Sequence, residues 1–190
     1  MKLNKKILVS LLVLAGSAAH AKSNFALTSD DMKANSVIAN KHVFKGFGCT
    51  GDNISPALSW QGAPAGTKSF ALLVHDANAP TGGAGWWHWV AYNIPATTNT
   101  LAQGAGTADG TKLPAGTLQT NTDFGAQGWG GPCPPEGHGK HNYIFTVHAL
   151  KVEKLELPAG ATASLAGYMI NANSLATAKL RGVYSRTKTK

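Results

Sequence analysis

The amino-acid sequence predicts a mainly β domain, a β-sandwich with one or two peripheral helices, of which the clearer lies near the C-terminus. Segments with strand-like patterns of apolar residues outnumber helical segments. Charged residues make up only 14% of the chain, and its 22 glycines and 9 prolines favour strands and ordered loops over helices. Many strands with few helices indicate sheets packed face to face.

Five segments are expected to form strands. Residues 24–29 and 57–62 are short, and residues 69–76, SFALLVHD, form an apolar run that we expect to be buried on both faces. Residues 86–94 and 142–150 alternate, so each should present one set of side chains to one face. The two sets are Trp86, His88, Val90 and Tyr92, and His141, Tyr143, Phe145 and Val147.

The clearer helix is expected over residues 161–180, with Thr162 as its N-cap. Its apolar side would consist of Leu165, Met169, Ala172 and Ala176. The segment LRGVYSRT, residues 180–187, is expected to return as a strand. A second, weaker helix is expected near residues 29–33, SDDMK.

The first 21 residues are expected to be a secretory signal peptide. A basic start precedes an apolar run over residues 7–16, and the pattern Ala19-His20-Ala21 places cleavage after Ala21. The run is shorter than the roughly 20 residues of a transmembrane helix. Cleavage would leave residues 22–190 as a single domain in the periplasm or outside the cell. Because three lysines leave with the peptide, the formal charge falls from +8 to +5.

This remaining charge does not indicate a nucleic-acid partner. Much of it lies in the last ten residues, RGVYSRTKTK, which we interpret as a solvated end of the chain. Nucleic-acid binders usually carry a basic stripe interleaved with aromatic residues, and the sequence shows none.

Cys49 and Cys133 are the two cysteines. An even number in an exported protein favours a disulfide. It would close a loop of about 84 residues and contribute roughly 4–5 kcal/mol in the chain-entropy model. Two free thiols are the alternative.

A long irregular region, residues 95–135, is expected between the fourth and fifth strands, and loops of this length usually carry function. In the overlapping stretch GWGGPCPPEGHGKHNY, residues 128–143, prolines fix the backbone and glycines allow conformations that other residues avoid. A rigid backbone loses little entropy when a ligand binds. We therefore interpret this stretch as one wall of a preorganised pocket.

The side chains near this wall are those that recognise anions. Asp76 ends an apolar strand, where a buried carboxylate needs a partner; His88 on the next strand is the candidate, unless Asp76 caps its own turn. Protonated His88 and His141, the hydroxyl of Tyr143 and the indole of Trp86 would donate hydrogen bonds. This set predicts a recognition site for a small anionic group.

Four motifs follow one another along the chain. They are DANAP at residues 76–80, WWHWV at 86–90, GGPCPP at 130–135 and HNY at 141–143. In order and spacing they resemble the phosphatidylethanolamine-binding protein family. The segments FGCTGDNISPALSW at residues 47–60 and NIPA at 93–96 resemble its bacterial Raf-kinase-inhibitor-like branch, and in particular the exported members.

The resemblance covers about residues 24–186. It implies the family's β-sandwich and a small pocket for phosphate-like or other anionic groups. The residues that match the family's pocket pattern are Asp76, Trp86, His88, Pro132, His141 and Tyr143.

Two motifs depart from the family pattern. Where the family has D-P-D-A-P, this chain has Ala77 and Asn78, and Asn142 replaces the arginine of H-R-Y. An arginine is a bidentate phosphate donor, so the implied pocket lacks one strong donor. If positions 78 and 142 pair in relatives, the two changes accompany each other.

No enzyme and no cofactor are expected. The sequence has no G-x-S-x-G elbow, and its nine acidic residues form no obvious pair for glycoside hydrolysis. One alternative is a zinc or copper site through His138 and His141, completed by Asp76 or His88. Another is a hydrolase inhibitor that acts through protein contact, with the tryptophans of residues 83–89 as an exposed patch.

Overall fold

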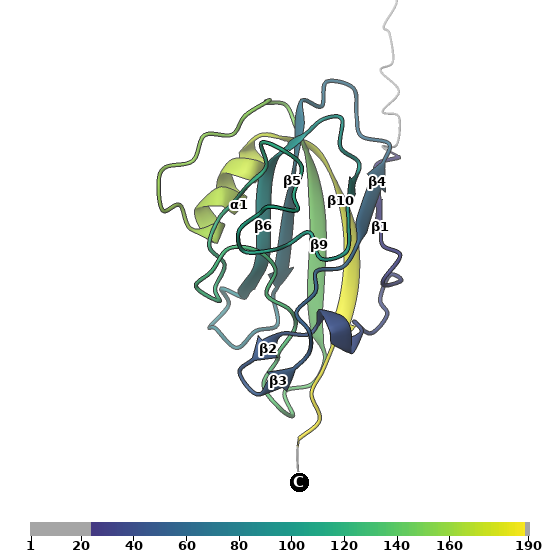
Figure 1. Cartoon of the computed structure of the whole chain (residues 1–190), viewed down its shortest axis with the longest axis vertical. Helices are drawn as coiled ribbons and strands as arrows, with labels where there is room; N and C mark the ends of the chain where they lie inside the picture. The colour runs from purple at the N-terminus through teal and green to yellow at the C-terminus, as the bar shows by residue number, and fades with distance from the viewer. Residues whose placement is uncertain (1–23, 189–190) are drawn as a thin grey trace, which may run out of the picture.

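The computed structural model describes residues 24–188, so the expected signal peptide, residues 1–21, lies outside the described residues (Figure 1). The larger sheet contains β5 (Ser69–Asp76), β6 (Trp86–Pro95), β8 (Leu118–Gln119), β9 (His141–Leu150) and β10 (Ser174–Tyr184), in the order β10-β9-β5-β6-β8. A second sheet contains β1 (Ala26–Thr28), β4 (Leu58–Gln61) and β7 (Thr100–Leu101), in the order β1-β4-β7.

Three further elements complete the described chain. A hairpin is formed by β2 (Lys45–Gly46) and β3 (Cys49–Thr50), a short 3-10 helix η1 spans Asn40–His42, and the helix α1 spans Ala163–Ala172. The strands within each sheet pair antiparallel. The prediction of a mainly β fold with a helix near the C-terminus is therefore confirmed.

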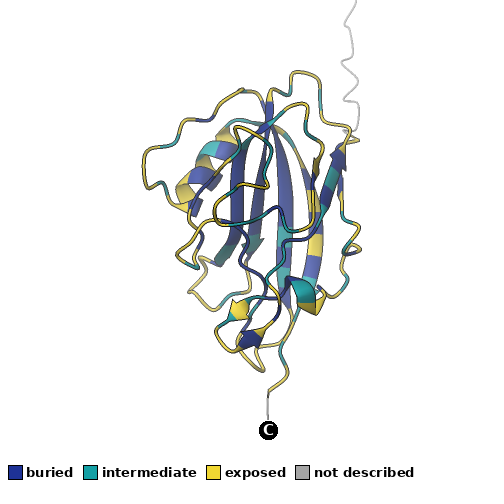
Figure 2. Cartoon of the chain, viewed as in Figure 1, coloured by how far each residue is buried: buried dark blue, intermediate teal, exposed yellow. Residues whose placement is uncertain are grey.

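Both faces of the larger sheet are covered, which makes its central strands the most buried part of the chain (Figure 2). Phe70, Leu72 and Val74 of β5 pack against the smaller sheet, whereas Ala71 and Leu73 lie in the cluster under α1. The expectation that residues 69–76 are buried on both faces is thus confirmed. Each fully buried large apolar side chain contributes about 1.5–3 kcal/mol.

A bulge in β6 changes which side chains share a face. Val74 pairs with Trp89 and His75 with Trp87, so His88 is an extra residue in β6. Beyond it, Trp89 packs in the sandwich core and Val90 packs under α1. The expected common face of Trp86, His88, Val90 and Tyr92 is therefore wrong. The bulge turns Val90 and Tyr92 away and leaves Trp86 and His88 on the core side.

The expected helix over residues 161–180 is only half correct. Thr162 is the N-cap, and its Oγ1 accepts a hydrogen bond from the amide of Leu165 (3.1 Å), but α1 ends at Ala172. Its buried residues are Ala163, Ala166, Gly167 and Ile170 rather than the expected set.

Residues 174–184 form β10 because they pair along the whole edge of β9, from Ser174 opposite Leu150 to Tyr184 opposite His141. Tertiary pairing here outweighs the local helical pattern. The weak helix expected near residues 29–33 is also wrong, since this segment forms bends rather than a helix.

Candidate ligand-binding site

A cavity of about 280 Å³ opens where three strands meet. Asp76 is the last residue of β5, and the sheet register places it opposite both Trp86, the first residue of β6, and Tyr143 in β9. Antiparallel pairing therefore gathers residues from three distant parts of the sequence. The cavity is lined by Phe47, Asp76, Ala79, Pro80, Thr81, Trp86, His88, Phe124, Cys133, Pro134, Pro135, His141 and Tyr143.

Five of the six residues expected in the pocket line this cavity, and Pro132 does not. The carbonyl oxygen of Pro132 instead accepts a hydrogen bond from the amide of Phe44 (3.1 Å), which fixes the loop behind the cavity. Its neighbours Cys133 and Pro134 supply the wall.

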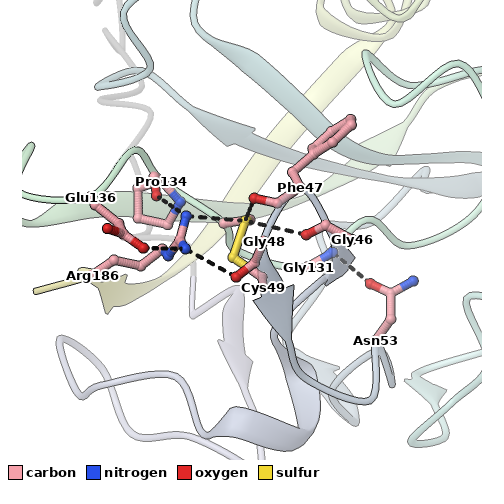
Figure 3. Close-up of a disulfide and its surroundings, with 10 residues drawn as sticks. Gly46, Phe47, Gly48, Cys49, Asn53, Gly131, Pro134, Glu136 and Arg186 are labelled. Atoms are coloured by element: carbon pink, nitrogen blue, oxygen red, sulfur yellow. Dashed lines mark hydrogen bonds and ion pairs between the residues drawn. A yellow bond between two sulfur atoms is a disulfide. The ribbon is translucent and has the colours of Figure 1, made fainter. Parts of the chain in front are cut away.

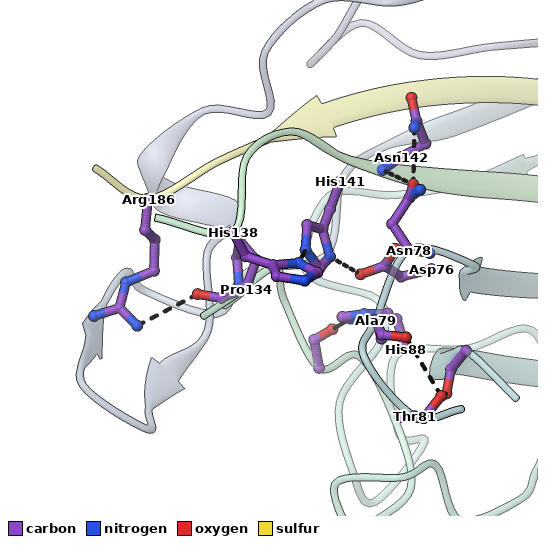
Figure 4. Close-up of polar contacts among 12 residues, drawn as sticks. Asp76, Asn78, Ala79, Thr81, His88, Pro134, His138, His141, Asn142 and Arg186 are labelled. Atoms are coloured by element: carbon purple, nitrogen blue, oxygen red, sulfur yellow. Dashed lines mark hydrogen bonds and ion pairs between the residues drawn. The ribbon is translucent and has the colours of Figure 1, made fainter. Parts of the chain in front are cut away.

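Asp76 is 3% exposed and is paired with His141, not with His88 as expected. Its Oδ2 accepts a hydrogen bond from Nδ1 of His141 at 2.6 Å, because His141 begins the strand beside β5. Its Oδ1 accepts from the amide of Asn78 (2.9 Å), so Asp76 also caps its own turn. Figure 4 shows the chain of contacts from Asp76 through His141 to His138.

His88 is held by the Gly-Pro loop. Its Nδ1 lies 2.5 Å from the carbonyl oxygen of Gly130, and the rings of Phe124 and Tyr143 pack edge-on against it. Burial lowers the pKa of His88 to about 4, an effect that the bond to Gly130 and the charge of Asp76 oppose only in part. His88 is therefore neutral near pH 7.

Two side-chain donors among the lining residues make no hydrogen bond to the described part of the protein. They are the hydroxyl of Tyr143 and the indole N–H of Trp86. Burial, followed by the nearby charge of Asp76, raises the pKa of Tyr143, so the hydroxyl keeps its proton. Both groups therefore keep a proton and lack a hydrogen-bond partner within the described residues.

The wall formed by residues 128–135 requires glycine. A Cβ on Gly131 would lie 2.1 Å from the backbone oxygen of His42, and one on Gly130 would meet the ring of Phe124. Asn53 fixes the same segment: its Oδ1 accepts from the amide of Gly131 (2.8 Å) and its Nδ2 donates to the carbonyl of Trp129 (2.9 Å). Sequence reasoning missed Asn53, since its partners lie more than 70 residues away.

The expected disulfide between Cys49 and Cys133 is present, with a Cα–Cα distance of 6.0 Å (Figure 3). It ties the β2–β3 hairpin to the wall of the cavity. Arg186 supports the same junction, because its guanidinium donates to the carbonyl of Gly48 (3.0 Å) and pairs with Glu136 (2.8 Å).

Two aromatic side chains that sequence reasoning did not place in the site, Phe47 and Phe124, also line the cavity. Phe47 lies at the tip of the hairpin, is 69% exposed and has a φ of 52°, which is unusual for a bulky residue. The ring of Phe124 packs between those of Phe44 and Trp86, at centroid distances of 4.4 and 5.5 Å. Most of the cavity's wall is therefore apolar.

The two motif departures meet in space. The amide N–H and Nδ2 of Asn142 both donate to Oδ1 of Asn78, at 3.0 and 2.8 Å. Neutral amides thus join the end of β5 to the start of β9 beside the cavity.

The metal alternative gains no support. Nδ1 of His138 lies 2.8 Å from Nε2 of His141, so the two ring nitrogens bond to each other. Within residues 24–188, no group of three or more His, Cys, Asp or Glu side chains is placed to hold a metal ion.

The expected tryptophan patch is also not formed. Trp89 is fully buried, and Trp87 packs on the ring of His75 (4.3 Å) while its indole N–H donates to Ser164 (3.2 Å).

The fold and its cavity are those of a binding protein, and comparison with known proteins gives the family. The family model for the phosphatidylethanolamine-binding protein matches residues 19–185, so the chain belongs to this family. The protein YbcL of Escherichia coli K12 is 48% identical over 180 residues, which cover 95% of this chain and 98% of YbcL. YbhB of the same organism is 46% identical over 159 residues, covering 84% of this chain and 99% of YbhB.

The fold agrees with that of a solved relative. The crystal structure of E. coli YbcL, described as a member of the mammalian PEBP family, matches with a TM-score of 0.82 and 52% identity. The match covers 85% of this chain and 98% of that structure. Across the described residues, no helix is both long and apolar enough to cross a membrane.

Proposed function

We propose that this protein is a non-enzymatic, exported binding protein whose cavity takes a small acidic group, phosphate-like or carboxylate. One observation carries the proposal: five side chains capable of recognition converge on a single cavity of about 280 Å³. They are Asp76, Trp86, His88, His141 and Tyr143. Family membership supports a ligand-binding role.

The chemistry of the lining favours binding over covalent catalysis. Its sulfur, Cys133, is in a disulfide, and the hydroxyl of Thr81 donates to the carbonyl of Gly85 (3.0 Å). Neither is an activated nucleophile. The rigid wall and the free donors on Tyr143 and Trp86 suit a ligand with acceptor oxygens.

Export is supported by the leader sequence and by the disulfide. Residues 1–21 have the three-part pattern of a signal peptide. Disulfides persist in oxidising compartments such as the periplasm.

Titration with inorganic phosphate and with acetate, followed through the histidine NMR signals, tests the proposal. We expect the signals of His88 and His141 to shift on binding, while that of His148, which is outside the cavity, stays fixed. Tyr143→Phe removes one donor and should weaken phosphate binding about fivefold to thirtyfold. Tyr92→Phe, on the opposite face of the sheet, is the matched control. Histidine signals that respond to neither ion would refute the proposal.

A further inference from the structure

The side chains of His88 and Asp76 present hydrogen-bond acceptors, not donors, to the cavity. A carbonyl oxygen can only accept, so the bond to Gly130 fixes the proton of neutral His88 on Nδ1. Its Nε2 therefore carries a lone pair, and it has no hydrogen-bond partner in the described structure. The carboxylate of Asp76, which also lines the cavity, accepts hydrogen bonds only.

His141 adds no free donor. Its Nδ1–H donates to Asp76 (2.6 Å), and its Nε2 is bonded to His138 (2.8 Å). The free side-chain donors among the lining residues are then the hydroxyl of Tyr143 and the indole of Trp86. A ligand that satisfies the site must both accept hydrogen bonds and donate one.

We propose that the cavity selects oxyanions that carry a proton of their own, namely phosphate monoesters, and rejects sulfate esters of the same shape. This inference rests on the proposed function and names its ligand class. The protonated oxygen of the phosphate donates to Nε2 of His88, and its other oxygens accept from Tyr143 and Trp86. A sulfate ester holds no proton near neutral pH, so its oxygens would face the lone pair of His88 and the carboxylate of Asp76.

The surroundings of His88 keep the proton on the ligand. The titratable groups that line the same cavity are Asp76 on β5 and His141 and Tyr143 on β9. The charges of His75 on β5 and of Asp123 in the loop after β8 also act on His88. Burial outweighs the nearby carboxylates and lowers the pKa of His88 to about 4. A phosphate monoester has a second pKa of about 6, so it takes up the proton more readily than His88 does.

Calorimetric titration with methyl phosphate and methyl sulfate tests the inference on the unaltered protein. At pH 5 the two ions have the same shape and the same single charge, and they differ by one P–OH proton. We expect methyl phosphate to bind at least about tenfold more tightly. At pH 7.5, where most free methyl phosphate lacks the proton, binding should take up about one proton, measured in buffers of different protonation heat.

The outcomes separate the two proposals. Equal affinity for the two ions, or binding of methyl phosphate at pH 7.5 without proton uptake, would overturn the inference and leave anion binding intact. Binding of neither ion would overturn the proposed function as well.

A pair of variants locates the effect. His88→Gln replaces the lone pair with an amide that can donate, so the preference for methyl phosphate at pH 5 should fall to about twofold or less. His148→Gln alters an equally buried histidine of β9, bonded to Ser174 (2.8 Å) and outside the cavity, and should leave the preference unchanged. A preference that persists in His88→Gln would overturn the role of His88. If this variant does not fold, the comparison on the unaltered protein still decides.

Discussion

His88 shows how a neighbour far along the chain sets the chemistry of a residue. Its sequence neighbours are tryptophans, but its proton position is fixed by the carbonyl of Gly130, 42 residues away. The low pKa comes from burial among Phe124, Tyr143 and the Gly-Pro loop. A similar burial lowers the pKa of His148 to about 4, with the charge of Lys179 as a smaller cause.

These two histidines predict a pH dependence of stability. Their folded pKa values of about 4 lie below the unfolded value of about 6.5, so the unfolded chain binds more protons between those pH values. The free energy of unfolding should therefore fall as the pH is lowered from 6.5 toward 4. Denaturant unfolding at several pH values measures the slope. His88→Gln and His148→Gln should each reduce this slope by the equivalent of about one proton taken up on unfolding. A slope unchanged in both variants would contradict the low pKa values of the two histidines.

The amide pair beside the cavity predicts a measurable coupling. Asn78→Ala removes both hydrogen bonds, whereas Asn142→Ala removes only the one donated by Nδ2 and keeps the backbone bond. Because both variants lose the side-chain bond, each should lower the free energy of unfolding by about 1 kcal/mol. The double variant should cost less than the sum of the two single variants. A double-mutant cycle from denaturant unfolding checks this, and strict additivity would show that the pair does not interact.

At the scale of elements, the bulge in β6 and the wall at residues 128–135 decide the shape of the site. The bulge keeps Trp86 and His88 on the cavity side of the sheet. The residues of β6 after the bulge pack alternately in the sandwich core and in the cluster under α1. Gly131 of the wall lies against the backbone at the end of η1, and Gly130 lies against the ring of Phe124, so neither position has room for a side chain.

Gly131→Ala should therefore disrupt the wall. Its Cβ would lie 2.1 Å from the backbone oxygen of His42, which cannot move without shifting the chain. We expect the free energy of unfolding to fall by about 3 kcal/mol and methyl phosphate binding to be lost. Gly139→Ala is the control: no atom lies within 4 Å, and its positive φ costs only about 1 kcal/mol. Similar losses in both variants would show that the close contact is unimportant.

At the scale of the whole molecule, the disulfide joins the N-terminal third of the chain to the cavity wall. Replacing both Cys49 and Cys133 by serine should lower the free energy of unfolding by about 4–5 kcal/mol in the chain-entropy model. Ligand binding should also weaken, because the hairpin that carries Phe47 loses its tie to the wall. Denaturant unfolding of the variant and of the reduced protein checks this. A loss below about 1 kcal/mol would contradict it.

Prediction from sequence succeeded where a feature depends on neighbouring residues or where few pairings are possible. The apolar run of residues 69–76 matches β5, because a buried strand needs apolar residues on both faces. Thr162 caps α1 because the cap depends on the next three residues. With two cysteines, one intrachain disulfide is possible.

Prediction failed where contacts with residues far along the chain determine the local structure or the hydrogen-bond partner. Residues 174–180 have a helical pattern but form a strand on the edge of β9. Asp76 bonds to His141 rather than His88, since the pairing of β5 with β9 sets that contact. Pro132 faces Phe44 instead of the cavity.

The sequence by itself determined the central strands β5, β6 and β9, the family and the kinds of side chain that a ligand meets, because apolar periodicity and motif order are properties of neighbouring residues. Only the tertiary structure decided that Nε2 of His88 lacks a partner within the described residues and that Asp76 is bonded to His141. The first feature depends on a hydrogen bond that spans 42 positions of the chain, and the second on one that spans 65. No local sequence pattern records such contacts.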